Sequence, residues 1–397
     1  MSVKLHVAFQ DGSLVRPSDR TPNLVHLVRA LAALAGADEV ERSPCVGSLM
    51  EEVGPADHLV FVLLDGLGMN LVEKLDPGAF IARHFRRELI STCPSTTACA
   101  LTSVATGEYA SRHGVTGWFT YMPDLGISIA TLPFVERITK QPLVDRGIRP
   151  EDVIAVGPLS PHMSHEPMTF TPANLTNTTY NLFTRGGTPG YGYRTFREAV
   201  DGIIARIRSA ERPTYTHLYL PEVDNACHRW GVHHPEVMSL VMTIDGEMER
   251  LAAGLEGRAR IVISADHGLL DVPPEDQVLL LAGDPMLDLL AVPPSGDARM
   301  PVFHVRDGRG KAFVEAFAER FGEGIRLVGI DEAEEMELFG PGRLSPVARR
   351  RFGDYIGFPC TATSVAYHPL NKPPSHLYRA IHAGLSPEEM RIPLTIA

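Results

Sequence analysis

The stretch His58-Leu-Val-Phe-Val-Leu-Leu-Asp65-Gly66 decides the fold expected of this chain. Its apolar run up to Leu64 is typical of a parallel strand that is covered on both faces. The run ends at an Asp-Gly pair, and a helical pattern follows to about Leu75. Because ligands of open α/β sheets bind beyond the carboxyl ends of the strands, we expect Asp65 to lie at a functional site.

The same succession of strand and helix recurs along the chain. The further units are the strand Leu89 to Thr92 with the helix Ala98 to Ala105, the helix Thr195 to Ala210 with the strand His217 to Leu220, and the helix Pro235 to Leu255 with the strand Arg260 to Ser264. The alternation predicts an α/β fold, with a doubly wound, mostly parallel sheet and helices on both faces.

The remaining segments suggest three regions. Residues 1–54 are predicted to form an N-terminal wrap with one amphipathic helix, around Leu24 to Ala37. Residues 276–354 contain a strand, helix and strand pattern and are expected to form a small inserted α+β subdomain. The catalytic core is then expected to comprise residues 55–275 and 355–397.

Composition limits the partners and the location. The 397 residues include 44% hydrophobic and 21% charged residues, as in a globular protein, and the net charge of -11 argues against binding a nucleic-acid polymer. We find no apolar run long enough to span a membrane and no signal peptide, so we expect a cytoplasmic protein without membrane contact. The five cysteines form no C-x-x-C pair. The oligomeric state stays open.

Two Asp/His pairs follow apolar strands. Asp224 and His228 are four residues apart, so both lie on one face if the chain turns helical, and Asp266 and His267 are adjacent. Mixed carboxylate and imidazole ligands suit zinc and similar transition metals better than magnesium or calcium. With Asp65 as a third carboxylate, two dications would leave a net charge of about plus one, which would attract a phosphoryl group.

Thr97 is the candidate nucleophile. It follows the turn Cys93-Pro-Ser-Thr and opens a helix of small residues, so helix N–H groups could bind phosphate oxygens beside it. A bound metal lowers the pKa of an oxygen ligand and would activate the hydroxyl group. The sequence therefore predicts attack by Thr97 on phosphorus and a phosphothreonine intermediate that water hydrolyses.

A set of short motifs, taken in order, is more specific than any one of them. They are Leu64-Asp-Gly66, Pro94-Ser-Thr-Thr97, Arg112-His-Gly114, Asp224-x-x-x-His228, Ala265-Asp-His-Gly268 and His382-Ala-Gly-Leu-Ser-Pro-Glu-Glu-Met390. Together they resemble the type I phosphodiesterase/nucleotide pyrophosphatase family of the alkaline phosphatase superfamily. The resemblance extends from residue 58 to about residue 394.

This resemblance implies an alkaline-phosphatase-like core with two divalent metal ions, expected to be Zn²⁺ with Mn²⁺ as the alternative. One ion would be held by Asp224, His228 and His382. The other would be held by Asp65, Asp266, His267 and the Thr97 oxygen. The implied activity is hydrolysis of a phosphodiester or pyrophosphate bond in a small organic phosphate.

The sequence departs from the family at two positions that bear on substrate binding. Ala98 stands where members that act on nucleotides commonly have a base-stacking aromatic residue, and Trp118 stands where they have a phosphate-binding Asn. Four other residues are candidate replacements for substrate contacts: Thr102, Asn174, Asn177 and Arg185.

Three alternatives to a diesterase stay open. The chain could be a phosphomonoesterase or phosphonate hydrolase on the same scaffold. It could be a non-catalytic homologue that retains metals and phosphate affinity, or a phosphomutase. The physiological substrate and its leaving group are not indicated by the sequence.

Overall fold

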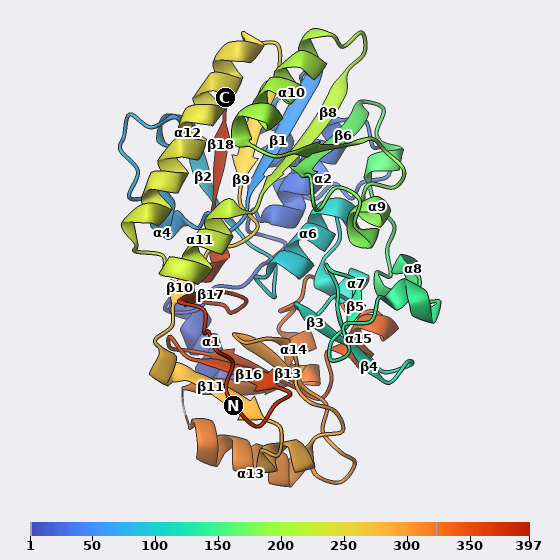
Figure 1. The fold of residues 1–397 in the computed structure, drawn as a ribbon, viewed down its shortest axis with the longest axis vertical. Coiled ribbons are helices and arrows are strands. Elements are labelled where there is room, and N and C mark those ends of the chain that lie inside the picture. Colours follow the sequence, from blue (N-terminus) through green and yellow to red (C-terminus); the bar gives the residue numbers. More distant parts are fainter. Residues whose placement is uncertain (1, 323) are drawn as a thin grey trace.

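The protein is built on two large sheets, which lie in the upper and lower halves of the molecule in Figure 1. The computed structural model describes residues 2–322 and 324–397. We call the upper sheet the core sheet. In spatial order, its strands are β2 (Phe85–Ile90), β18 (Arg391–Ile396), β9 (Arg260–Ser264), β1 (His58–Leu64), β8 (Thr214–Leu220), β6 (Glu166–Pro172) and β7 (Gly190–Tyr193).

The core sheet is mostly parallel, as the sequence predicts. Strand β1 pairs in parallel with β8 on one side and β9 on the other, and Leu59 to Leu64 are all buried. Strand β18 lies between β9 and β2 and runs antiparallel to both. The apolar run His58 to Leu64 is therefore a central strand covered on both faces.

Helices cover both faces of the core sheet, with α10 and α12 in front of it and α2 behind it in Figure 1. The main helices of this layer are α2 (Leu24–Leu34), α3 (Pro44–Val53), α6 (Thr97–Thr106), α10 (Phe196–Arg208), α11 (Glu222–Trp230) and α12 (Pro235–Leu255). Their apolar sides and the strands form one continuous hydrophobic core. The expected α/β fold with a doubly wound sheet is confirmed.

The N-terminal region is more helical than expected. The predicted wrap with one helix, residues 1–54, contains α1 (Ser2–Gln10) and α3 in addition to α2. Helix α3 has a Ser43 cap, which accepts a hydrogen bond from the Val46 N–H, and Pro44 at its first position. A capping serine followed by proline is a usual helix start, so the sequence did carry this signal.

The second large sheet, called the second sheet, is antiparallel. In spatial order, its strands are β14 (Ile325–Gly329), β15 (Tyr355–Pro359), β13 (Met300–Phe303), β12 (Ser295–Asp297), β3 (Phe119–Met122), β4 (Ile127–Ala130) and β5 (Val135–Glu136). It is larger than the inserted segment 276–354 expected from the sequence, because 119–136 and 355–359 contribute strands. The contact of Gly296 with Phe119 joins the distant segments, and local sequence patterns do not reveal such pairing.

The described part of the chain contains further α-helices and two small sheets. The helices are α4 (Met69–Val72), α5 (Phe80–His84), α7 (Ala110–His113), α8 (Pro150–Val153), α9 (Thr179–Thr184), α13 (Gly310–Phe321), α14 (Ile330–Glu335), α15 (Pro346–Arg351) and α16 (Pro387–Met390). Two small sheets pair β10 (Leu270–Asp271) with β17 (Ala380–Ile381), and β11 (Gln277–Leu281) with β16 (Ser364–His368). None of the helices described has both the length and the hydropathy of a membrane span.

The carboxyl ends of β1, β8 and β9 face the second sheet in the middle of the molecule (Figure 1). A buried ion pair links the two halves there. Arg299, beside β13, donates from Nε and Nη2 to the two carboxylate oxygens of Glu389 at 3.0 and 2.7 Å. Glu389 also accepts a hydrogen bond from the Gly384 N–H at 2.7 Å. The second sheet thus holds the C-terminal segment that carries His382.

Candidate metal centre

Three strand ends of the core sheet bring the predicted ligands together. Asp65 follows β1, Asp224 lies in α11 just after β8, and Asp266 and His267 follow β9. The turn after β1 requires glycine, because Gly66 has a φ of +79° and a Cβ atom there would lie 2.8 Å from the Asp224 Cα atom. The Asp65-Gly66 pair is therefore a turn that brings two acidic residues close together.

Asp65, Asp266 and His267 form the first buried group. Their possible ligand atoms all lie within 4.8 Å of one another. The His267 Nε2 atom is 3.5 Å from Asp65 Oδ1 and 3.4 Å from Asp266 Oδ2. These three side chains are fully or almost fully enclosed.

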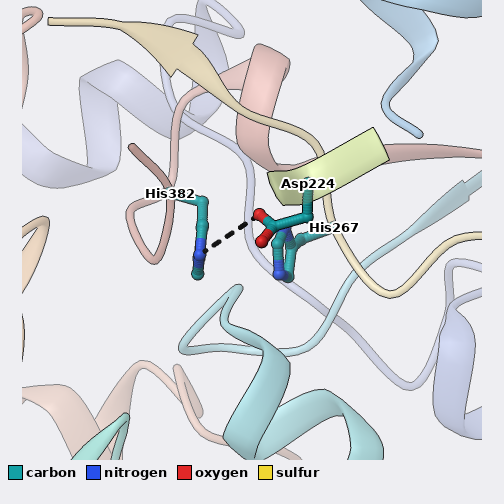
Figure 2. A group of neighbouring side chains, drawn as sticks. All are labelled: Asp224, His267 and His382. Atoms are coloured by element: carbon teal, nitrogen blue, oxygen red, sulfur yellow. Dashed lines mark ion pairs between the residues drawn. The ribbon is translucent and has the colours of Figure 1, made fainter. Parts of the chain in front are cut away.

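Asp224, His267 and His382 form the second group, shown in Figure 2, and their ligand atoms also lie within 4.8 Å of one another. His382 Nε2 is 3.7 Å from Asp224 Oδ1, and the His267 and His382 rings stack with centroids 3.9 Å apart. His228 Nε2 approaches the same Asp224 oxygen at 3.3 Å. His267 is therefore a member of both groups, and the two buried triads are consistent with a binuclear metal site.

Backbone carbonyls orient all three histidine rings. The Nδ1 atoms lie within hydrogen-bond distance of main-chain oxygens: His228 of Ala380 at 2.7 Å, His267 of Gly268 at 3.1 Å and His382 of Ser95 at 3.1 Å. Because a carbonyl can only accept, each Nδ1 carries a proton, and each Nε2 atom is directed at the carboxylates. Outer contacts of this kind orient histidines that bind metals.

Hydrogen bonds also orient the carboxylates of Asp65 and Asp266. Tyr219 donates to Asp65 Oδ2, while Asp266 Oδ1 accepts from the N–H groups of Gly66 at 3.1 Å and His267 at 2.9 Å. The other oxygens, Asp65 Oδ1, Asp266 Oδ2 and Asp224 Oδ1, are buried and have no hydrogen-bond partner among the described residues. These are the oxygens that face the histidine Nε2 atoms. Buried carboxylate oxygens without partners, next to imidazole nitrogens, form a set of ligand atoms that a cation would stabilise.

The pKa shifts have the same cause. Burial raises the pKa of Asp65 well above its usual value, and the nearby Asp266 and Asp224 raise it further. Burial also raises the pKa of Asp224. Burial lowers the pKa of His382 well below its usual value, and His267 and His228 act in the same direction. The enclosed pocket therefore disfavours the ionised forms of Asp65, Asp224 and His382, and a bound cation would favour ionised carboxylates beside a neutral His382.

Thr97 lies beside the first group. It opens α6 and is 6% exposed, and its Oγ1 atom is 3.1 Å from His267 Nε2. The preceding loop is attached to the C-terminal segment, because Ser95 donates to the Gly384 carbonyl at 2.7 Å and forms a bridge with Ala383. His382 directly precedes Ala383 in this C-terminal segment. The contact that positions the loop before Thr97 therefore also positions one of the predicted ligands.

A cavity of about 480 Å³ opens at Thr97. Asp224, His228 and His382 contribute to its wall on the side of the core sheet. On the other side, Trp118 and Asp297 belong to the wall, and the Trp118 N–H donates to the Asp297 carboxylate at 2.7 Å. Burial raises the pKa of Asp297 to about 6. A fourth carboxyl group therefore stands near the two triads.

The structure brings the seven predicted ligand and nucleophile residues together but leaves the four predicted substrate residues elsewhere. Thr102 is buried within α6, where its hydroxyl group contacts the Ala98 carbonyl at 2.7 Å and the Tyr180 hydroxyl at 3.1 Å. Asn174 and Asn177 are exposed, and Arg185 lines a separate, smaller pocket. The Thr97 cavity is lined by other residues.

Three residues at the site were missed by sequence reasoning: Tyr219, Asp297 and Arg137. Tyr219 had a signal, because a tyrosine hydroxyl on a buried strand requires a partner. Asp297 and Arg137 had none, since they reach the cavity only through the pairing of the second sheet.

Comparisons with known proteins agree with the fold and the motifs. A search of curated protein sequences gives no match. Among solved structures, murine ectonucleotide pyrophosphatase/phosphodiesterase 5 is 15% identical, with a TM-score of 0.63 over 85% of this chain and 87% of that chain. An inactive variant of it in complex with AMP and the human protein are each 14% identical, with the same coverage and TM-score.

The family model is the more specific comparison. The type I phosphodiesterase/nucleotide pyrophosphatase model matches residues 59–289, which is more than half of the chain and includes six of the seven predicted ligand and nucleophile residues. His382 lies beyond the matched range. The chain is therefore an enzyme of the type I phosphodiesterase/nucleotide pyrophosphatase family, within the alkaline phosphatase superfamily.

Proposed function

We propose that the protein hydrolyses a phosphodiester or pyrophosphate bond of a small organic phosphate, with Thr97 as the nucleophile and two divalent metal ions at the strand ends. The observation that carries this proposal is the set of three buried carboxylate oxygens without partners, which face histidine Nε2 atoms. Such a set fits metal ions of intermediate hardness, so we expect zinc, with manganese as the alternative.

The proposed ligands fall into two sets. Asp224, His228 and His382 would hold one ion at the cavity wall. Asp65, Asp266 and His267 would hold the other beside Thr97. His267 belongs to both groups of ligand atoms that lie within 4.8 Å of one another. We assign it to the ion beside Thr97.

The fold of the chain positions Thr97 as the proposed nucleophile. Thr97 stands at the first position of α6, so the helix N-terminus and its free N–H groups favour a phosphate group there. When bound, the ions would lower the pKa of the Thr97 hydroxyl and stabilise charge on the phosphoryl group. Thr97 Oγ1 then attacks phosphorus, the leaving oxygen departs, and the phosphothreonine is hydrolysed by water to regenerate the hydroxyl group.

Asp297 favours a diester over a monoester. A phosphodiester carries one negative charge, whereas a phosphomonoester carries up to two at neutral pH. Because Asp297 is half-buried in the wall of the same cavity, its carboxylate would repel the additional charge of a monoester. The identity of the ester groups stays open, but the murine relative in complex with AMP makes nucleotide esters part of the first substrate panel.

The test is to load the purified protein with zinc and compare kcat/KM for bis(4-nitrophenyl) phosphate and 4-nitrophenyl phosphate. We expect the diester to be the better substrate by at least about tenfold. A faster monoester would identify the phosphomonoesterase alternative. If neither compound nor a panel of phosphonate esters and nucleotide esters is cleaved by protein containing two ions per chain, the non-catalytic alternative is correct.

A further inference from the structure

The wall of the cavity at Thr97 includes a second group of side chains that can bind a ligand. Beyond the side formed by Asp224, His228 and His382, its wall includes Arg137, Phe119 and Tyr367. Phe119 lies in β3 and Tyr367 in β16, so segments about 250 residues apart in the sequence meet around one arginine. None of these three residues is a proposed metal ligand.

Arg137 is a buried cation without an acidic partner. Its side chain is 7% exposed, and among the described residues no carboxylate lies within ion-pair distance of it. The guanidinium group donates to the carbonyls of Pro294 and, at 3.2 Å, Tyr367. Burial lowers its pKa to about 10, so the positive charge persists at neutral pH. A guanidinium group has five N–H donors, and two carbonyls do not neutralise its charge.

The other buried arginines are accounted for within the protein. Arg29 pairs with Glu41 and Glu108, and Arg299 pairs with Glu389. Arg351 has no ion pair in the described part of the chain, but it donates to the carbonyls of Gly114, Val153 and Asp152 and contributes nothing to the wall of the Thr97 cavity. Arg137 is thus distinguished by a charge without a counter-ion that meets open space.

The charges of Asp297 and Glu136 raise the pKa of Arg137, but neither carboxylate lies within ion-pair distance of the guanidinium group, and both bond to main-chain N–H groups. Glu136 accepts hydrogen bonds from the N–H groups of Ile138 and Thr139, and Asp297 accepts one from Trp118. The guanidinium carbon lies 4.0 Å from the centroid of the Phe119 ring and 5.1 Å from that of Tyr367. Two aromatic rings and two carbonyls therefore fix the orientation of the charge in advance of binding.

We propose that Arg137, with Phe119 and Tyr367, forms a subsite for a second anionic group on the substrate, separate from the phosphoryl group that reacts. This inference rests on the proposed diesterase function and narrows it to organic phosphates that carry another carboxylate or phosphate. Arg137 binds that group and is not itself part of the chemical step. Guanidinium is the cation best suited to planar recognition of carboxylate and phosphate oxygens.

The test compares two diesters of the same shape. 4-Nitrophenyl 4-carboxyphenyl phosphate and 4-nitrophenyl 4-carbamoylphenyl phosphate both release nitrophenolate and differ in one negative charge. With the zinc-loaded protein, we expect kcat/KM to favour the carboxyl compound by at least about tenfold, mainly through KM, because a spectator group is bound alike before and during reaction. In Arg137→Met, the ratio should fall to within about threefold of one.

Two further variants keep the test decisive. Arg137→Lys should retain part of the preference, and Arg351→Met, which removes a buried arginine outside the cavity, should retain all of it. If Arg137→Met does not fold, the kcat/KM ratio of the wild-type protein and that of Arg137→Lys still test the subsite. Cleavage of both esters at equal rates by the wild-type protein would overturn the subsite while leaving the diesterase function intact. Cleavage of neither would refute the function itself.

Discussion

The core sheet and the second sheet divide the work of this enzyme differently. The core sheet contributes Asp65, Asp224, Asp266 and His267 from the ends of its strands, where the parallel topology makes them converge. The second sheet contributes Asp297 and supports the wall around Arg137, where strands from distant segments pair. The comparison teaches that the proposed reactive centre follows from strand ends of one sheet, whereas the residues proposed to select a substrate meet only through long-range assembly.

The largest effect should come from the nucleophile on the core-sheet side. Thr97→Ala removes the attacking oxygen, so we expect turnover of a diester to fall by at least about a thousandfold while metal content stays near two ions per chain. Steady-state kinetics and metal analysis check both statements. Thr106→Ala is the control, because its hydroxyl group donates to the Thr102 carbonyl at 2.7 Å and accepts from the Glu108 N–H at 3.2 Å, and Thr106 does not line the Thr97 cavity. Retained turnover in Thr97→Ala would remove Thr97 from the mechanism.

The connection between the two sheets should have the next largest effect. Glu389→Gln leaves the fully buried Arg299 without its carboxylate, and breaking a buried pair in this way costs about 3–5 kcal/mol of folding free energy. Urea unfolding at neutral pH measures the loss. Asp331→Asn, which removes an exposed partner of Arg349, should cost less than about 1 kcal/mol. Equal stability of Glu389→Gln and wild type would mean that the pair does not hold the sheets together.

The charge on the second-sheet side should alter selectivity more modestly. Asp297→Asn retains an oxygen to accept the Trp118 N–H but removes the charge that would repel a monoester. We expect the monoester-to-diester ratio of kcat/KM to rise by about tenfold, as one weakened like-charge contact implies. The same change at the exposed Asp307 should leave the ratio unaltered. An unaltered ratio in Asp297→Asn would show that selectivity arises elsewhere.

A loss of stability at low pH is expected around His113, which lies in α7. His113 is fully buried, with Nε2 3.1 Å from Ser103 Oγ, and burial lowers its pKa to about 3. An unfolded histidine has a pKa of about 6.5, so the unfolded chain binds the proton first, and stability present above pH 6.5 is lost as the pH falls toward 3. Between pH 7 and pH 5 one such histidine accounts for about 2 kcal/mol.

His113→Gln should therefore lose about 2 kcal/mol less than wild type over that pH interval, whatever its stability at pH 7. Urea unfolding at both pH values gives the two differences. His162→Leu, at an exposed position, is the control and should show the wild-type loss. An identical pH dependence in His113→Gln and wild type would contradict a neutral, buried His113.

Much of the core sheet could be predicted because its signals are local. The apolar run of β1 and the start of α12 at Pro235 are visible in short windows, and the Asp/His pairs mark strand ends directly. His382 was different, since nothing in its spacing separates it from the other histidines. Its place followed from the family resemblance alone, and the structure shows why: the attachment of Ser95 to Gly384 brings it to the site.

The second sheet could not be predicted to the same extent. Its strands β3 and β12 are about 175 residues apart in the sequence, and each alone is too short to indicate a partner. The expected substrate residues Asn174, Asn177 and Arg185 were chosen for their chemistry in a polar loop, but the fold places the cavity elsewhere. Side-chain chemistry identifies candidates, whereas long-range pairing decides which of them meet.

The most direct test of the two-metal centre is a crystal structure of the zinc-loaded protein with anomalous scattering data collected at the zinc edge. We predict two anomalous peaks at the carboxyl ends of the core-sheet strands, one among Asp224, His228 and His382 and one among Asp65, Asp266 and His267 beside Thr97. A single peak, or peaks away from these side chains, would contradict the account.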